Sequence, residues 1–360
     1  MRVRPGVRWI ALGGVCAMLA GCSTVRYYWQ AAMGQWQVQN AARPLEAVLT
    51  DPATDARLRA RLETARGLRE YASRSLALPD NGSYRRYADL KRPYVVWNVF
   101  AAAEFSVEPR QWCFPVAGCV TYKGWFHEAA ARRFAQQLAG EGFDVFVYGV
   151  PAYSTLGWFD DPLLNTFMHY PRAEVARLVF HELAHQVVYA PGDSTFNESF
   201  ATAVERDGVR RWLAREGTPD ERAEFEAMGQ RRQGFVALVE RTRAQLAALY
   251  ARPLEAAALR AEKARVFEDM RTAYQGLKRG WGGFAGYDRW FDQPLGNAHL
   301  ASVAVYTQQV PAFEALLAVC GGDHGRFHAA GKQLAALPND RRAAALAALA
   351  AGESPACPGH

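Results

Sequence analysis

The spacing of hydrophobic residues predicts a chain that is mostly helical. Over residues 27–78 the apolar residues recur three and four positions apart, which is the spacing of one helix face. The same spacing returns after Pro171 and continues through residues 220–276, where Arg252-Pro253 indicates a turn between two long helices. An alanine-rich segment over residues 341–351 predicts a final helix.

The pattern differs between residues 94 and 153, where β-branched and aromatic residues are concentrated. Tyr94–Phe100 and Phe143–Tyr148 have the composition of strands, and residues 127–139 between them predict a helix that ends at Gly140. A turn-rich segment, Tyr153–Pro162, follows. The sequence shows no internal repeat, so we expect one compact α+β unit, mostly helical, with a small sheet beside the helices.

The composition agrees with a folded protein and excludes several other classes. Of the 360 residues, 50% are hydrophobic and 12% are aromatic, which excludes a largely disordered chain. Beyond the N-terminal segment, no apolar run approaches the roughly 20 residues of a membrane-spanning helix. No cluster of basic residues interleaved with aromatic ones is present, so we expect no nucleic acid partner.

The first residues have the features of a secretory signal. Three arginines precede the apolar run Trp9–Ala20, and Cys22 follows it. Leu19-Ala20-Gly21-Cys22 also resembles the lipobox of bacterial lipoproteins, which implies cleavage after residue 21 and a lipid on Cys22. Ser23 resembles the pattern of lipoproteins that are sent to the outer membrane. We expect residues 1–21 to be a lipoprotein signal peptide and the mature chain, residues 22–360, to be anchored in the bacterial envelope and to face the periplasm. An ordinary signal peptide is the alternative.

Cleavage also lowers the net charge. The three arginines are the only charged residues that it removes, so 42 basic residues become 39 against 36 acidic residues, a net charge of +3.

Four cysteines remain in the mature chain besides Cys22. An even number in an exported protein favours disulfides. Cys113 and Cys119 are separated by a short loop with proline and glycine, which predicts a local bridge, and Cys320 would then pair with Cys357. The alternative interpretation, zinc ligands, lacks a second pair of closely spaced cysteines.

The candidate chemistry is concentrated in one pentapeptide, His181-Glu182-Leu183-Ala184-His185. Residues four apart share a helix face, so both imidazoles can bind one metal ion, for which zinc is the usual choice. Glu182 lies next to them and can act as the general base toward water. Apolar neighbours on several sides predict a buried helix, where two histidines and a glutamate would be costly without a function. Ordinary hydrogen-bonded histidines are the alternative.

A catalytic zinc site needs a third protein ligand, and Glu198 is the candidate. A short loop from His185 to about Thr195 would return the next helix alongside the first and place Glu198 in its first turn. Alternatively, Thr195 and Glu198 form a capping box, and Asp193 is a weaker substitute for the ligand. Glu205, seven residues after Glu198, is either a support for a ligand histidine or a solvated glutamate.

HELAHQ followed by NESFATAVE resembles the gluzincin metallopeptidases, particularly the M1 aminopeptidases. More closely, the chain resembles a family of bacterial lipoproteins described as zinc aminopeptidases, over most of the mature sequence. The matching segments outside the metal motif are Trp112–Cys119, Tyr153–Gly157 and Asn297–Leu317.

This resemblance implies a fold, and the sequence departs from the family pattern in two respects. It implies a gluzincin core of the thermolysin/M1 type over residues 90–215, with N-terminal helices at 22–80 and a helical C-terminal part at 216–360. The separation of His185 from Glu198 is shorter than in M1 enzymes or thermolysin, so the substrate-binding apparatus between the two helices does not transfer. The sequence also contains no clear counterpart of the M1 motif that grips the substrate's free amine.

The resemblance implies two further features of the site. Related peptidases place an edge strand for an extended substrate before the metal helix, and Tyr153–Trp158 is the candidate, with a buried aromatic turn as the alternative. Gluzincins stabilise the oxyanion with a tyrosine or histidine beyond the third ligand. Tyr306 is the candidate, with His299 as the fallback and a plain core tyrosine as the alternative.

We therefore expect an envelope-anchored zinc metallopeptidase, an aminopeptidase by resemblance, that acts on a peptide or protein substrate. His181, His185 and Glu198 would hold one Zn²⁺ per chain. The alternative from another class is a lipoprotein that uses the peptidase fold as a binding or assembly scaffold. The helical segments 27–78 and 220–276 are long enough to dock another protein, whereas a binding module has no need of Glu182.

Overall fold

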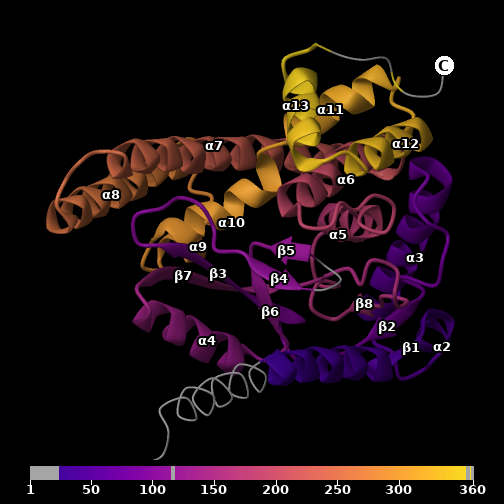
Figure 1. Cartoon of the computed structure of the whole chain (residues 1–360). Helices are drawn as coiled ribbons and strands as arrows, with labels where there is room; N and C mark the ends of the chain where they lie inside the picture. Colours follow the sequence, from indigo (N-terminus) through magenta and orange to yellow (C-terminus); the bar gives the residue numbers. More distant parts are fainter. Residues whose placement is uncertain (1–23, 115–117, 354–356, 358–360) are drawn as a thin grey trace, which may run out of the picture.

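The computed structural model describes residues 24–114, 118–353 and 357. Within them helices predominate, and the strands form two three-stranded sheets and a two-stranded hairpin (Figure 1). A helix over residues 24–41 comes first. The elements that follow are β1 (Ala42–Pro44), α2 (Leu45–Leu49), α3 (Ala56–Leu76), β2 (Arg86–Ala88), β3 (Val96–Ala103), β4 (Trp112–Phe114), β5 (Gly118–Val120), β6 (Lys123–Trp125), α4 (Glu128–Gly140), β7 (Phe143–Val150), β8 (Leu163–Leu164), α5 (Arg172–Ala184), α6 (Ser194–Glu216), α7 (Pro219–Tyr250), α8 (Ala256–Gly280), α9 (Asp288–Phe291), α10 (Asn297–Thr307), α11 (Val310–Val319), α12 (His324–Ala335) and α13 (Asn339–Ala350).

The larger sheet has the strand order β6-β3-β7, and both pairings are antiparallel. Successive residues of β3 face opposite sides, as in any strand. Trp97 and Val99 pack with α4 on one face, and Phe100 packs with α10 on the other. The sheet is therefore covered on both faces, and the run Val96–Ala102 is buried throughout.

The second sheet joins the N-terminal part of the chain to the segment that precedes α5. Its order is β1-β2-β8, with β1 antiparallel and β8 parallel to β2. These strands are two or three residues long, so they show no alternating pattern that a sequence can reveal. They position α3, which packs against α5.

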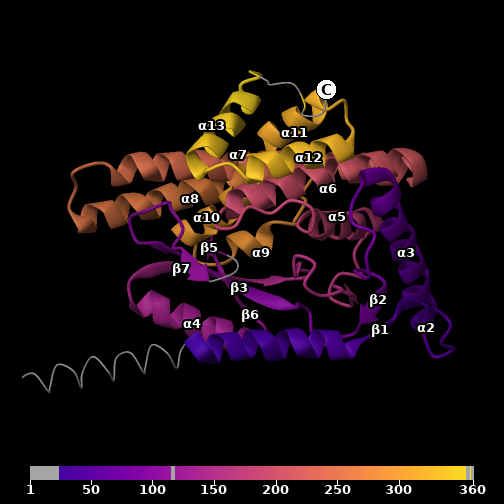
Figure 2. The same ribbon diagram turned by 45° about the vertical axis from the view of Figure 1, so that its right-hand side comes forward.

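Helices α5 and α6 form the centre of the main hydrophobic core. They pack against each other, and α3, α10 and α11 surround them. All but four residues of α5 are buried, as the apolar positions on several of its sides predict. Figures 1 and 2 both show α7 and α8 side by side as a long hairpin, and the smaller helices α11 to α13 near the C-terminus.

The structure contains both predicted disulfides, Cys113–Cys119 and Cys320–Cys357. The first links β4 to β5, and the second ties residue 357 to the end of α11. The predicted signal peptide, residues 1–21, and Cys22 lie outside the described residues. Among the described helices, none is both long enough and apolar enough to cross a membrane.

The predicted helices and strands whose sequences show a clear hydrophobic pattern are confirmed. The predicted strands correspond to β3 and β7, the helix at 127–139 to α4, and the hairpin at 220–276 to α7 and α8. The predicted edge strand Tyr153–Trp158 is wrong, because these residues form a turn. Thr155 donates from its backbone nitrogen and its hydroxyl to Asp161, and these bonds fold the segment back on itself.

Candidate active site

Helix α5 carries the HExxH motif at its C-terminal end. It begins after Pro171, whose ring suits a helix start. His181 and Glu182 lie in its last turn, and His185 follows directly as the C-cap residue. All three side chains are buried, because α6 covers this end of the helix.

Helix α6 begins two residues earlier than the capping-box alternative requires. Asp193 is the N-cap, and its carboxylate accepts from the backbone nitrogen of Phe196. The other carboxylate oxygen lies 3.0 Å from Nε of Arg342. Asp193 is therefore occupied as a helix cap, and the prediction that it could replace Glu198 is wrong. Glu198 lies in the second turn of α6, not the first.

Asn197 holds the loop that joins the two helices. Its amide nitrogen donates to the backbone oxygen of Ala190, and its oxygen accepts from the backbone nitrogen of the same residue. Both bonds are buried, so they fix the distance between the end of α5 and the start of α6. Glu198, the next residue, is thereby turned toward the histidines.

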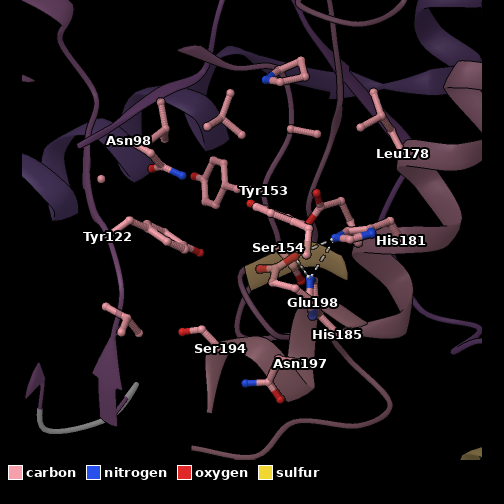
Figure 3. A pocket seen from close by; sticks show the side chains of 18 of the residues that line it. Asn98, Tyr122, Tyr153, Ser154, Leu178, His181, His185, Ser194, Asn197 and Glu198 are labelled. Atoms are coloured by element: carbon pink, nitrogen blue, oxygen red, sulfur yellow. Dashed lines mark hydrogen bonds and ion pairs between the residues drawn. The ribbon is translucent and has the colours of Figure 1, made fainter. Parts of the chain in front are cut away.

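His181, His185 and Glu198 converge on one point (Figure 3). Nε2 of His181 lies 3.1 Å from Oε2 of Glu198 and 3.2 Å from Nε2 of His185. Nε2 of His185 lies 3.7 Å from the same carboxylate oxygen. One ligand atom from each residue lies within 4.8 Å of the other two, which is the spacing of donors around a single metal ion.

The protonation pattern shows that this cluster suits a cation. Nδ1 of His181 lies 2.9 Å from Oε2 of Glu205 and donates to it, so a neutral His181 presents the lone pair of Nε2 to the carboxylate of Glu198. Two imidazole nitrogens and a carboxylate oxygen thus face one another. Such acceptors repel unless a positive charge lies between them.

The pKa values of His181 and Glu198 also show that positive charge is favoured at this site. Burial lowers the pKa of His181, but its hydrogen bonds to Glu198 and Glu205 outweigh burial and raise it to about 10. Burial raises the pKa of Glu198, but the neighbouring histidines outweigh this and lower it to about 2. Without a metal, the site takes up a proton in place of one.

Glu205 supports His181 and is not a solvated glutamate. It is 2% exposed, and besides His181 it contacts two arginines. Arg177 lies 3.1 Å from one carboxylate oxygen and Arg232 lies 3.3 Å from the other. These cations hold the pKa of Glu205 down at about 2 against the effect of burial, so it stays charged and fixes the tautomer of His181.

Glu182 lies in the wall of the same cavity, and among the described residues no hydrogen bond joins its side chain to His181, His185 or Glu198. Burial raises the pKa of its carboxyl group above the ordinary value. A carboxylate with a raised pKa is a stronger base than an ordinary glutamate.

The cavity measures about 790 Å³ and separates α5 and α6 from the larger sheet. Asn98 of β3 and Tyr122, just before β6, lie across the cavity from the two histidines and Glu198 (Figure 3). The remaining walls are largely apolar and include Val96, Phe114 and Phe126. The helix over residues 24–41 contributes Tyr27, Tyr28 and Ala31 to the rim.

Tyr306, at the end of α10, lines this cavity as the sequence interpretation requires. Its ring centre lies 6.4 Å from that of His181, and its hydroxyl lies 3.2 Å from the hydroxyl of Tyr148. Burial raises the pKa of Tyr306 well above the ordinary value, and Glu198 adds to the effect. The hydroxyl therefore keeps its proton and can donate it in a hydrogen bond.

His299 does not lie in the cavity, so its fallback role is wrong. It is buried in the third position of α10, where Nδ1 accepts from the backbone nitrogen of Gly296. Its ring packs against Phe146 at 4.1 Å. Burial lowers its pKa to about 3, so it is a neutral core residue.

Sequence reasoning missed several residues of the site. Tyr148 and Asn98 come from the larger sheet and Tyr122 from the residue before β6, and nothing in their own segments connects them with the HExxH helix. Arg177 could have been found, because it precedes His181 by four residues and so lies on the same helix face. The segment Tyr153–Trp158 forms a turn and not the expected edge strand, yet its residues Tyr153 and Ser154 line the cavity.

Comparison with known proteins gives one match. No curated protein and no solved structure matches the chain significantly. A protein-family model, described as "Putative aminopeptidase", matches residues 26–346. This range includes the residues that line the cavity, among them His181, Glu182, His185 and Glu198. The chain therefore belongs to this family of aminopeptidase-like proteins.

Proposed function

We propose that this protein is a zinc-dependent peptidase, with a gluzincin type of site in which His181, His185 and Glu198 are the metal ligands. The observation that carries the proposal is the convergence of three buried acceptor atoms beside Glu182 in the wall of one cavity. Two imidazoles and a carboxylate are a usual catalytic zinc set, which leaves a position for water and substrate.

Glu182, Glu205 and Tyr306 each have a separate role in the proposed hydrolysis. A zinc ion held there supplies a Lewis acid that lowers the pKa of water and polarises a carbonyl group. Glu182 takes the proton from the attacking water and passes it to the departing amine. Glu205 keeps His181 in the tautomer that binds metal, and the hydroxyl of Tyr306 donates to the oxyanion that develops on the substrate.

The shape of the cavity favours a peptide with an apolar side chain. One wall carries the charged groups, whereas Val96, Phe114, Val120 and Phe126 line the far side. An apolar side chain placed there would lose its contact with water while the peptide bond faces Glu182. The family match supports a peptide substrate, and we further propose that the substrate has a free N-terminus.

The location belongs to the same proposal. The sequence around Cys22 supports lipid attachment after removal of residues 1–21. We propose that the mature chain is anchored in the bacterial envelope, at the outer membrane, and faces the periplasm.

Hydrolysis by the mature chain with Cys22→Ser tests the proposal directly. We expect release of product from aminoacyl naphthylamides, and loss of about 100- to 10,000-fold of this rate in Glu182→Gln. Glu63→Gln, an exposed position on α3, is the matched control and should keep full activity.

The choice of substrates separates the possible outcomes. Cleavage only of substrates with a free amine supports an aminopeptidase, and cleavage of N-acetylated peptides indicates an endopeptidase. Equal rates in the wild type and Glu182→Gln would contradict enzymatic catalysis at this site.

A further inference from the structure

The helix over residues 24–41 is fixed to the body of the protein by its inner face. The side-chain amide of Gln30 bonds to both the backbone oxygen of Gly124 and the backbone nitrogen of Phe126, at 3.4 and 3.1 Å. Gly34 packs directly against the ring of Phe126 and leaves no room for a side chain. The hydroxyl of Tyr153 donates to the side-chain oxygen of Gln35 in this helix. The helix cannot rotate without breaking these contacts.

Its outer face is apolar and exposed. Val25 is 68% exposed, Trp29 67% and Trp36 58%. At 3.6 residues per turn these three positions lie within about 40° of one another around the helix axis. Figures 1 and 2 both show this helix along one border of the molecule, with no other element on its outer side.

A neighbouring loop extends the same surface. Trp158 and Phe159 are exposed, and the next residue, Asp160, accepts a bond of 3.2 Å from Nε2 of Gln39 at the end of the helix. We call this set the aromatic border. It contains six of the seven exposed large hydrophobic residues in the described part of the chain: Val25, Tyr28, Trp29, Trp36, Trp158 and Phe159. Such clustering marks an interaction surface, whereas scattered exposed residues do not.

The charges of the helix favour a lipid surface. Residues 24–41 contain no aspartate or glutamate and one basic residue, Arg26, which is exposed. The other exposed polar residues are the uncharged Thr24, Gln37 and Asn40. A helix face turned to water usually carries charges of both signs, whereas tryptophan, tyrosine and arginine are typical of the headgroup region of a bilayer.

The chain that precedes the helix also points to a membrane. With cleavage after residue 21, only Cys22 and Ser23 precede residue 24, so a lipid on Cys22 lies within about 8 Å of the helix start along the chain. The headgroups would therefore be the nearest surface to Val25 and Trp29. This step alone rests on the proposed lipid attachment; the exposed face does not.

We propose that the aromatic border is a membrane-docking surface, and that the helix lies flat on the bilayer with Val25, Trp29 and Trp36 among the headgroups. The same helix also lines the cavity of the candidate active site through Tyr27, Tyr28 and Ala31. The docked bilayer therefore lies against the helix that borders the cavity, and the orientation of the site toward the membrane is fixed.

Vesicle binding by the mature chain with Cys22→Ser tests the surface without the lipid. The probe is vesicles of phosphatidylethanolamine and phosphatidylglycerol, with sedimentation and quenching of tryptophan fluorescence by brominated acyl chains as readouts. We expect the double variant Trp29→Ser with Trp36→Ser to reduce partitioning by about tenfold or more, because two large aromatic surfaces leave the interface. Val319, on α11, is the one exposed large hydrophobic residue of the described chain that lies outside the aromatic border. The variant Val319→Ser is therefore the control and should bind as the parent does.

The lipidated chain provides the second arm. Lipidated wild type should show stronger quenching by brominated lipid than the lipidated double variant, although both remain on the vesicles. Equal quenching in these two proteins would overturn the docking surface while leaving lipid attachment intact. Unchanged vesicle binding together with a loss of self-association in the double variant would also overturn it, and would assign the face to a second copy of the chain.

Discussion

Glu205 is the residue for which the sequence left two interpretations open, and its neighbours decide between them. Its bond to Nδ1 of His181 keeps Nε2 available as a metal ligand. We expect Glu205→Gln to weaken zinc binding by about 10- to 100-fold, measured by competition with a chelator of known affinity. Glu216→Gln, at the exposed end of the same helix, should leave the affinity unchanged. Equal affinities for the two variants would show that Glu205 does not support the ligand.

Tyr306 and Tyr148 form a pair whose roles differ. Only Tyr306 is proposed to contact the substrate oxyanion, whereas Tyr148 bonds to the hydroxyl of Tyr306. We expect Tyr306→Phe to lower kcat by about 100- to 1,000-fold with zinc content unchanged. Tyr148→Phe should lower kcat less, since it leaves the donating hydroxyl in place. Full activity in Tyr306→Phe would assign that tyrosine to the core.

The residues of the site that sequence analysis found are those whose relation is local. His181, Glu182 and His185 are related by the helical repeat, and Glu198 follows after one short loop. Tyr148 and Asn98 could not be found in this way, since their approach depends on how β3 and β7 lie against α5 and α6. His299 has a side chain that could donate to an oxyanion, and only its burial against Phe146 shows that it belongs to the core.

The loop between α5 and α6 sets the position of Glu198 relative to the histidines. Asn197→Ala removes both buried bonds to Ala190 and leaves the backbone nitrogen of Ala190 without its partner, while the backbone oxygen still accepts from the backbone nitrogen of Asp193. We expect a loss of about 1–3 kcal/mol in the free energy of unfolding, measured with urea on the metal-free protein. Zinc affinity should fall as well, because the two helices lose their fixed separation. Unchanged stability would mean that the loop is held by other contacts.

Long elements were predictable, and short ones were not. α7 and α8 show many turns of one hydrophobic period, and β3 and β7 are eight residues each. The strands β1, β2 and β8 are too short to show any period, so the second sheet could be found only from its pairing. The edge strand expected at Tyr153–Trp158 came from the family resemblance alone, whereas the turn-rich composition of the segment agrees with the turn that its hydrogen bonds to Asp161 hold.

At the scale of the whole molecule, buried histidines make stability depend on pH. His299 and His328 are buried, and this burial lowers the pKa of each to about 3. Unfolding returns each pKa to about 6.5, so the unfolded chain binds more protons between pH 6.5 and 3. The stability that these two histidines contribute is therefore fully present above about pH 6.5 and is lost as the pH drops, by about 1.4 kcal/mol per pH unit for each histidine well below that value.

The slope of stability against pH distinguishes this effect from a simple loss of packing. We expect His328→Asn to reduce the slope between pH 6 and 4 by about 1 kcal/mol per pH unit, whatever it does to the stability at neutral pH. Urea unfolding of the metal-free protein at several pH values measures it. An unchanged slope would show that His328 titrates alike in the folded and unfolded chains.

The central claim is that His181, His185 and Glu198 hold one zinc ion, and metal content tests it most directly. Elemental analysis of the purified mature chain with Cys22→Ser should find one zinc per chain, and His181→Ala should contain none, with the fold checked by circular dichroism. Glu182→Gln should keep its zinc, because it is not a ligand. An absence of bound metal in the folded wild type after zinc is supplied, or full zinc content in His181→Ala, would contradict the account.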